Sequence, residues 1–240
     1  MISDGLGIAG RVLLTVRDAQ GNIREQSEHR NTITNWTRAL IASFLSGSMT
    51  NIFVGTSHVQ PSLPYAIALG TGTGTPQLTD TSMFSETYNT RQQYTYRDVL
   101  NGYYAQTVVQ YPVNTSGNPI TYTEAGLWDQ VYTSTTLTGP VVPGDNQIGV
   151  DSNAPSMMNG QQLYIADSTN PEYATVSGSY ASGQGSWFLQ SGLQYSHAMG
   201  TTVYCFSGNL LAHVVFQGNG VTVGPGEQLT AQWQIYAQNG

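Results

Sequence analysis

Short runs of alternating apolar and polar residues recur through most of the chain, which is typical of β-strands that bury one face. Residues 11–16 form one such run, the turn-forming sequence Asp18-Ala19-Gln20-Gly21-Asn22 follows, and residues 23–29 form a second run. Turn residues between two such runs predict a β-hairpin. Similar runs predict further strands at residues 64–69, 94–99, 103–111, 120–123, 210–216 and 229–236.

One segment departs from this alternation. Trp36, Leu40 and Phe44 recur at helical spacing and are preceded by Asn35, a residue type that favours the N-terminal cap of a helix. The sequence therefore predicts a helix over residues 36–46, with the three apolar residues on its buried face.

The composition changes between residues 139 and 204, where loops rich in Pro and Gly separate shorter runs. We expect a small β domain at residues 139–204, inserted in a main domain of residues 1–138 plus 205–240, so that the ends of the insertion lie close together. The many short strands and single helix predict a mainly β fold, namely an antiparallel β-sandwich of jelly-roll-like arrangement. The strands predicted in the insertion are residues 162–165, 173–177, 187–189 and 202–206.

A glycine-rich run, Gly-Thr-Gly-Thr-Gly-Thr-Pro, occupies residues 70–76 directly after an apolar strand. Such a run can cradle a phosphate group, but a helix then starts behind it, and a P-loop also contains Lys. Neither feature is present here. We therefore expect a wide surface loop whose glycines permit positive φ angles.

Charge is scarce and uneven along the chain. Charged residues make up only 9% of it, against about 25% in typical soluble domains, and Thr, Ser, Asn, Gln, Gly and 15 Tyr take their place. All seven basic residues are Arg and precede position 98, and the formal net charge is -7. Nucleic-acid binding depends on clustered Lys and Arg, so we expect no nucleic-acid partner. The acidic surface suits either a partner with a basic patch or simple solubility.

Cys205 is the single cysteine and lies in an apolar run, which favours a buried, inert thiol. The N-terminal segment lacks the basic start and long apolar stretch of a signal peptide. No stretch approaches the roughly 20 apolar residues of a membrane span. We expect a protein that is made in the cytoplasm and has no membrane partner.

Few residues offer catalytic chemistry. The histidines are not at metal-ligand spacing, and we expect His213 to be a hydrogen-bonded sheet residue and His197 to bond to backbone in a turn. Glu124 and Asp129 form a carboxylate pair of the kind that glycosidases use, but residues five apart in a strand point to opposite faces. We therefore expect no enzyme activity and no cofactor.

Calcium is a separate possibility for the inserted segment. The loops around Asp145, Asp151 and Asn153 offer oxygen ligands, but they do not have the dense acidic pattern of an EF-hand. The sequence thus predicts no metal site and leaves calcium binding open.

Tyrosines gather between residues 88 and 111. Strand alternation places Tyr94 and Tyr96 on one face and Arg97 on the other, and the Asn101-Gly102 pair predicts a hairpin turn before the next strand. Exposed tyrosines suit a protein interface or stacking on sugars, whereas alternate tyrosines fill the core.

Several segments, in this order along the chain, resemble those of small structural proteins in tailed-bacteriophage particles. The likeness spans most of residues 10–138 and 207–237. In such proteins the Glu-Ala-Gly-Leu segment leads almost directly to the Gly-Asn-Leu-Leu segment, whereas here residues 139–204 intervene and themselves resemble small β modules of phage structural proteins. The segments of the main domain are Asn31-Thr32-Ile33-Thr34, residues 65–72 followed by Asp80-Thr81 and Phe84-Ser85-Glu86, residues 123–129 and residues 208–216.

The resemblance implies a virion component without catalysis. We expect a capsid cement or decoration protein that forms a homotrimer and binds the major capsid protein. The alternatives are a tail, baseplate or fibre-adaptor protein and a carbohydrate-binding receptor-recognition module. Glu124 is expected to bind backbone N–H groups or to pair with Arg91 or Arg97. The candidate structural or interface residues are Trp36, Glu124, Trp128, Tyr94, Tyr96 and Arg97.

Overall fold

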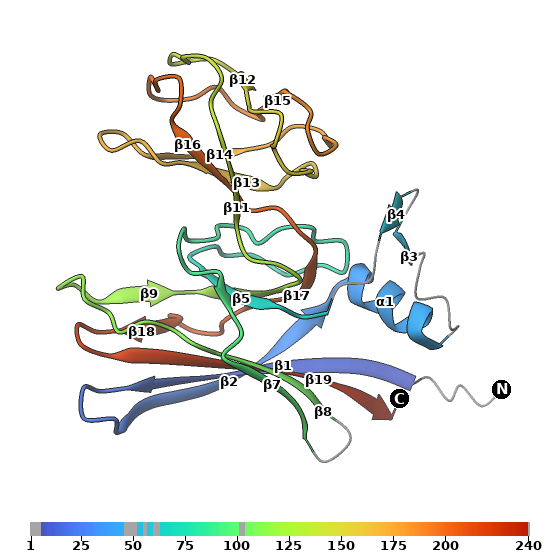
Figure 1. Ribbon diagram of the computed structural model, residues 1–240. Coiled ribbons are helices and arrows are strands. Elements are labelled where there is room, and N and C mark those ends of the chain that lie inside the picture. The colour runs from blue at the N-terminus through green and yellow to red at the C-terminus, as the bar shows by residue number, and fades with distance from the viewer. Residues whose placement is uncertain (1–5, 46–51, 55–56, 60–62, 101–103, 240) are drawn as a thin grey trace. The chain divides into compact units, whose positions relative to one another are not determined.

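The computed structural model describes residues 6–45, 52–54, 57–59, 63–100 and 104–239. The chain divides into two compact units, of which unit 1 comprises Met1–Asp129 and Asn209–Gly240 and unit 2 comprises Gln130–Gly208. Both units are mainly β (Figure 1). Within the described ranges α1 (Asn35–Leu45) is the one helix, and no helix there is long and apolar enough to cross a membrane.

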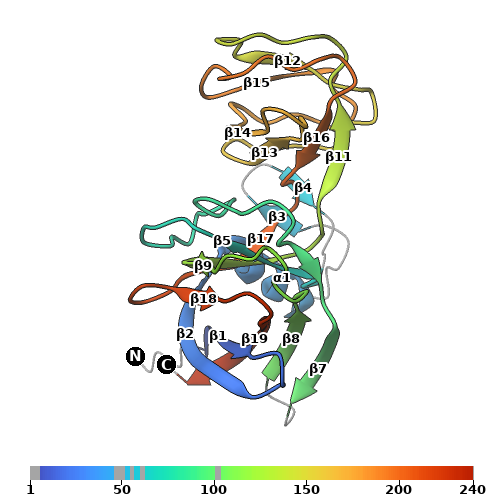
Figure 2. The same cartoon turned by 90° about the vertical axis from the view of Figure 1, so that its left-hand side faces the viewer.

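Unit 1 is built on a nine-stranded antiparallel sheet that curls on itself (Figure 2). The strand order is β6-β5-β10-β17-β2-β1-β19-β8-β7. In chain order these strands are β1 (Leu6–Arg17), β2 (Ile23–Ile33), β5 (Ala66–Gly70), β6 (Gln92–Gln93), β7 (Tyr96–Leu100), β8 (Tyr104–Gln110), β10 (Glu124–Trp128), β17 (Leu210–Val215) and β19 (Gln228–Asn239). Two further strand pairs are β9 (Ile120–Tyr122) with β18 (Val221–Val223) and β3 (Ile52–Val54) with β4 (Ser57–Val59).

Strand β2 belongs to both halves of the curled sheet. Most of its length pairs with β1, whereas Thr32 and Ile33 at its end pair with His213 and Ala212 of β17. Apolar side chains from both halves therefore meet in one buried core. This core includes Val12, Leu14, Leu69, Val109, Leu127, Leu211 and Trp233.

The helix begins one residue earlier than the sequence predicts. Asn35, the expected cap, is the first residue of α1, and the carbonyl of Thr34 accepts the hydrogen bond from the Arg38 N–H at 3.3 Å. Thr34 therefore occupies the cap position. Trp36 and Leu40 are buried as expected, and the side chain of Phe44 lies outside the described residues.

The predicted hairpin between β1 and β2 is confirmed. The Gly21 N–H donates to the carbonyl of Asp18 at 2.9 Å, and Gly21 has a φ of 86°, which glycine adopts without steric cost. Strands β7 and β8 also pair in antiparallel fashion, and the predicted Asn101-Gly102 turn between them lies outside the described residues.

Unit 2 has its own sheets and its own core. A four-stranded sheet has the order β11-β16-β13-β14, and β12 pairs with β15. Burial raises the pKa of the Cys205 thiol to about 12, which keeps it protonated within the core formed around Trp187 and Leu163. The strands are β11 (Thr133–Thr136), β12 (Gln147–Gly149), β13 (Gln162–Ile165), β14 (Glu172–Thr175), β15 (Ser186–Phe188) and β16 (Thr202–Cys205).

Unit 2 is longer than the insertion expected at residues 139–204. It starts at Gln130 because β11 pairs with β16, which ties residues before 139 to the inserted strands. Its ends join unit 1 at Asp129 and Asn209. The Asn209 N–H donates to Asp129 Oδ1 at 2.8 Å, and the Asp129 N–H donates to the Asn209 carbonyl at 3.3 Å. The insertion thus leaves and re-enters unit 1 at one point.

We expect unit 1 to fold without unit 2, because it has a separate core and its two chain ends are hydrogen-bonded to each other. In the test, Gln130–Gly208 is replaced by an Asn-Gly linker, which suits a two-residue turn between paired residues. Circular dichroism and denaturant titration should show a β protein with one cooperative transition. An NMR spectrum of the shortened chain with poorly dispersed amide resonances, or the absence of a cooperative unfolding transition, would show that unit 1 does not fold alone.

Candidate functional site

Residues 71–91 of unit 1 form an irregular segment, here named the cover segment, over the outer face of β10. All five residues of β10 are buried, so both of its faces are covered. A Cβ atom added at Gly126 of β10 would lie 2.7 Å from Met83 Sδ, and the rings of Phe84 and His213 are 4.8 Å apart between centroids. A long irregular segment needs bonds other than strand pairing to stay in place.

Glu124, at the start of β10, supplies the first of these bonds. Its side chain is fully buried, and Oε1 accepts the N–H groups of Gly72 at 3.0 Å and Ser85 at 2.7 Å. Oε2 accepts the N–H of Phe84 at 3.0 Å and lies 2.8 Å from His213 Nε2. The prediction that Glu124 binds backbone N–H groups is confirmed. Such bonds compensate a carboxylate for its lost hydration.

The glycine-rich run makes room for this carboxylate. A Cβ atom at Gly70 would lie 2.5 Å from Glu124 Oε1, and one at Gly72 would lie 2.4 Å from the same oxygen. Among the glycines of this run only Gly74 has a positive φ, so the expectation of positive φ at the others is wrong. Their physical role is close approach to a buried acid of the same chain.

His213 links Glu124 to a second acid. Its ring is fully buried, and Nδ1 lies 2.8 Å from Asp80 Oδ2, an oxygen that also accepts the Gln77 N–H at 2.9 Å. The prediction of a hydrogen-bonded sheet residue is confirmed. A neutral imidazole has one N–H and ionised carboxylates only accept, so two carboxylate partners require one additional proton within the cluster.

Arg91 and Glu86, both within the cover segment, pair with each other, and Arg91 also contacts Trp128 of β10. Both side chains are buried, and they pair through Nε–Oε1 at 2.9 Å and Nη2–Oε2 at 2.8 Å. The Arg91 guanidinium lies 3.7 Å from the centroid of the Trp128 ring. The bidentate pair with Glu86 replaces the expected pairing of Arg91 with Glu124. The contact with Trp128 joins the cover segment to β10 and gives Trp128 a structural role.

Unit 2 repeats the arrangement of acid, histidine and acid. His197 is buried, with Nε2 at 2.7 Å from Glu172 Oε1 and Nδ1 at 3.3 Å from Asp167 Oδ2. Glu172 also accepts the N–H groups of Gln194 at 2.9 Å and Tyr195 at 3.2 Å. The expectation that His197 bonds to backbone is wrong, because two carboxylates occupy its ring nitrogens.

In the two loops considered as calcium ligands, the Asp carboxylates accept hydrogen bonds from backbone N–H groups of their own loop. Asp145 Oδ2 accepts the Val142 N–H at 2.8 Å, and Asp151 Oδ1 accepts the Asn153 N–H at 3.1 Å. Among the described residues, no group of three or more His, Cys, Asp or Glu is placed to hold a metal ion.

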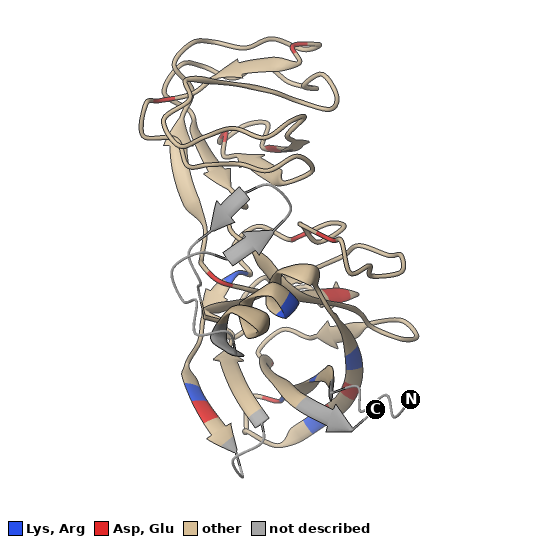
Figure 3. Ribbon diagram, turned by 90° about the vertical axis from the view of Figure 1, so that its right-hand side faces the viewer, with Lys and Arg blue, Asp and Glu red and all other residues tan. Residues whose placement is uncertain are grey.

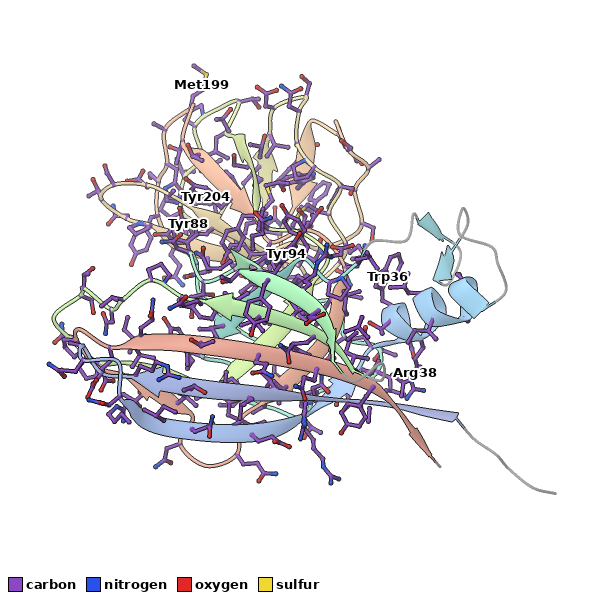
Figure 4. The ribbon with its side chains drawn as sticks, turned by 60° about the horizontal axis from the view of Figure 1, so that its bottom comes forward. Trp36, Arg38, Tyr88, Tyr94, Met199 and Tyr204 are labelled. Atoms are coloured by element: carbon purple, nitrogen blue, oxygen red, sulfur yellow. The ribbon has the colours of Figure 1, made fainter. Side chains whose placement is uncertain are left out.

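The remaining candidates lie at the surface near β7. Tyr94, labelled in Figure 4, is half-buried and precedes the strand. Tyr96 is 50% exposed. The Arg97 guanidinium lies 4.2 Å from the centroid of the Tyr94 ring, and Nη1 donates to the Pro64 carbonyl at 3.0 Å. The expected separation of Tyr94 and Arg97 onto opposite faces is therefore wrong, because strand alternation starts only at Tyr96. Trp36, in contrast, is buried beside the core.

Strand β7 ends the nine-stranded sheet and is exposed on both faces. Tyr96 and Val99 are 50% and 63% exposed, and Arg97 and Asp98 between them are exposed as well. The N–H of Val99 donates to Asp98 Oδ1 at 2.6 Å. The strand therefore offers side chains for contact, while an acidic side chain occupies one of its backbone donors.

The sequence pattern points to Glu124 and His213 separately and assigns no role to Asp80, Asp167 or Glu172. Gly126 is directly opposite His213 in the pairing of β10 with β17. Glu124, two residues from Gly126, is therefore a diagonal neighbour of His213. The strand register, which the sequence pattern does not give, is what brings Glu124 and His213 into contact.

In comparisons with known proteins, no protein-family model and no curated protein sequence matches the chain.

We expect Glu124→Gln to lower the free energy of unfolding by about 3–5 kcal/mol, since an amide cannot accept all four hydrogen bonds of this buried acid. Glu28→Gln is the matched control, because Glu28 pairs with Arg11 at the surface and should contribute less than about 1 kcal/mol. Denaturant unfolding measures both variants. Equal stability of the two variants would contradict the attachment role of Glu124.

Acid should weaken the cluster in unit 2. Hydrogen bonds from the Thr169 and Asn170 N–H groups and from His197 lower the pKa of Asp167 from 3.8, so the fold favours its ionised form. The resulting stability is present above pH 3.8 and is lost as the pH falls below that value. We expect Asp167→Asn to be less stable than wild type near neutral pH and the gap in melting temperature to close in acid. A gap independent of pH would count against this assignment.

Proposed function

We propose that the chain is a non-catalytic structural component of a tailed-bacteriophage particle, a capsid cement or decoration protein that stabilises the shell by binding the major capsid protein. The observation that carries the proposal is that the buried ionisable side chains serve to hold the fold together. The buried Glu124, Glu172, His197 and His213 hold irregular loops onto sheets, and their bonding atoms face other protein atoms.

The exposed surface supports the same proposal. Tyr96 and Val99 present exposed uncharged side chains on opposite faces of β7, a strand that is open on both faces. Aromatic side chains with few charges are typical of the centres of protein interfaces. Unit 2 has four acidic residues and no Lys or Arg (Figure 3), and three of the four, Asp145, Asp151 and Asp167, are partly exposed, which suits a partner with a basic patch.

We further propose that unit 1 is a β-sandwich of the jelly-roll type. The support is the shared core, in which β1, β8 and β19 from one half of the curled sheet supply side chains alongside β5, β10 and β17 from the other. We also propose that the chain forms a homotrimer, with three copies of β7 around one threefold axis. A trimer of this symmetry suits the threefold positions of an icosahedral shell.

The test compares particles that carry the wild-type protein with particles that carry Tyr96→Ser combined with Val99→Ser. We expect the double variant to fold normally and to bind particles about tenfold more weakly, since it loses an apolar contact. Ile23→Ser, at a residue that is 53% exposed outside β7, is the control. Bound copies are counted by cryo-electron microscopy, and heat resistance of the particles is measured in parallel.

Density over the capsid lattice, together with heat-sensitive particles when the protein is absent, is the expected result. Density confined to the tail would replace the cement role with that of a tail or adaptor protein. Particles that lack the protein and keep full heat resistance would overturn the cement role.

A further inference from the structure

A cavity of about 350 Å³ lies in unit 1 between the turn at residues 87–90 and the loop at residues 111–118. Its lining includes Leu69 and Leu229 of the core and Tyr122 of β9. This volume falls at the small end of the range for ligand pockets, about 300–1,000 Å³. The cavity therefore suits a small ligand.

Hydrogen bonds fix the turn on one side of the cavity. The Thr87 N–H donates to the Leu69 carbonyl at 2.9 Å. The Thr90 hydroxyl donates to that carbonyl at 2.7 Å and accepts the Leu69 N–H at 3.0 Å. Tyr88 and Asn89 thus sit at the tip of a turn that is held at both ends (Figure 4 labels Tyr88). Asn89 is the one non-glycine residue with a positive φ, 66°, in the described part of the chain.

The loop on the other side is equally well held. Asn114 donates through Nδ2 to the carbonyls of Asn118 at 2.8 Å and Val223 at 2.9 Å. Its Oδ1 accepts the N–H of Ser116 at 2.9 Å, and its own N–H donates to the Glu227 carbonyl at 2.8 Å. Both walls are therefore formed before any ligand arrives, which lowers the entropy lost on binding.

The lining carries no charged side chain and includes three tyrosines, Tyr88, Tyr111 and Tyr122. The hydroxyl of Tyr111 is already bonded to the Ile67 carbonyl at 2.9 Å. Burial raises the pKa of the Tyr122 phenol, which therefore stays protonated and able to donate. Within the described part of the chain, the Tyr122 hydroxyl and the side chains of Asn89 and Thr115 form no hydrogen bond with another protein group.

We propose that this cavity is a binding site for a neutral saccharide. A sugar ring has an apolar face that packs on a tyrosine ring, and its hydroxyl groups both donate and accept hydrogen bonds. The Asn89 amide, the Thr115 hydroxyl and the Tyr122 phenol in the lining can donate hydrogen bonds to the sugar hydroxyl groups and accept hydrogen bonds from them. The absence of any charged side chain from the lining disfavours anionic sugars, because a desolvated anion here would have no cationic partner. This site is separate from the contact surface on β7.

Binding is tested with the purified full chain, apart from any particle. Methyl glycosides of glucose, galactose, mannose and N-acetylglucosamine are titrated while amide and aromatic resonances are followed by NMR. We expect at least one glycoside to bind with millimolar affinity and to shift resonances of residues 87–90 and 111–118. Methyl glucuronide and methyl sialoside, as anionic probes, should not shift them.

Two variants locate the ligand without disturbing the fold. Tyr122→Phe keeps the ring and removes one hydroxyl, and Asn89→Gly removes the amide while tolerating the positive φ. Each should weaken binding about three- to tenfold. Tyr96→Phe, on β7, is the matched control and should bind as wild type does.

Absence of shifts with every neutral glycoside would overturn the proposal. So would binding that Tyr122→Phe and Asn89→Gly leave unchanged, or stronger shifts with the anionic probes. Because the assay uses no particle, its outcome is independent of the capsid role, and failure of one proposal leaves the other to be judged by its own experiment.

Discussion

Burial of the Glu124 carboxylate constrains most of unit 1. An acid with no exposed surface must find all its hydrogen bonds within the protein, and Glu124 finds them in three backbone N–H groups and His213. These bonds require glycine at positions 70 and 72 and bring the cover segment against β10. They also leave the second nitrogen of His213 to Asp80. One buried charge thereby determines the path of a segment that has little regular structure.

Unit 2 meets a similar constraint with different residues. Glu172 also accepts two consecutive backbone N–H groups and one histidine nitrogen, and Asp167 lies at the other nitrogen. The two units therefore share a way of attaching loops to sheets, although no strand of one pairs with a strand of the other among the described residues. The chain has few charged residues, and several of them, including Glu124 and Glu172, are buried and hold loops onto sheets. Few charged side chains therefore remain at the surface.

Local patterns in the sequence predict most strands, the β1–β2 turn and the helix, because alternation, turn chemistry and capping act over a few residues. They do not predict the clusters, because His213 is 133 residues from Asp80 and 89 from Glu124. Such contacts depend on strand register, which no local pattern defines. The start of unit 2 at Gln130 has the same cause, since only the pairing of β11 with β16 assigns residues 133–136 to the insertion. Alternation also misplaces Tyr94, because β7 begins only at Tyr96 and strand geometry does not extend to residue 94.

Strand β7, at one end of the nine-stranded sheet, bears on how the chain avoids aggregation. An open sheet edge with apolar side chains is a template for fibrillar aggregation, and crowding on a surface raises that risk. Here Arg97 and Asp98 interrupt the apolar positions, and the Asp98 carboxylate occupies the Val99 N–H. Cross-β growth from this edge would have to displace that bond and bring like charges together. The exposed edge of the sheet thus carries charges and an occupied backbone donor that oppose conversion to amyloid.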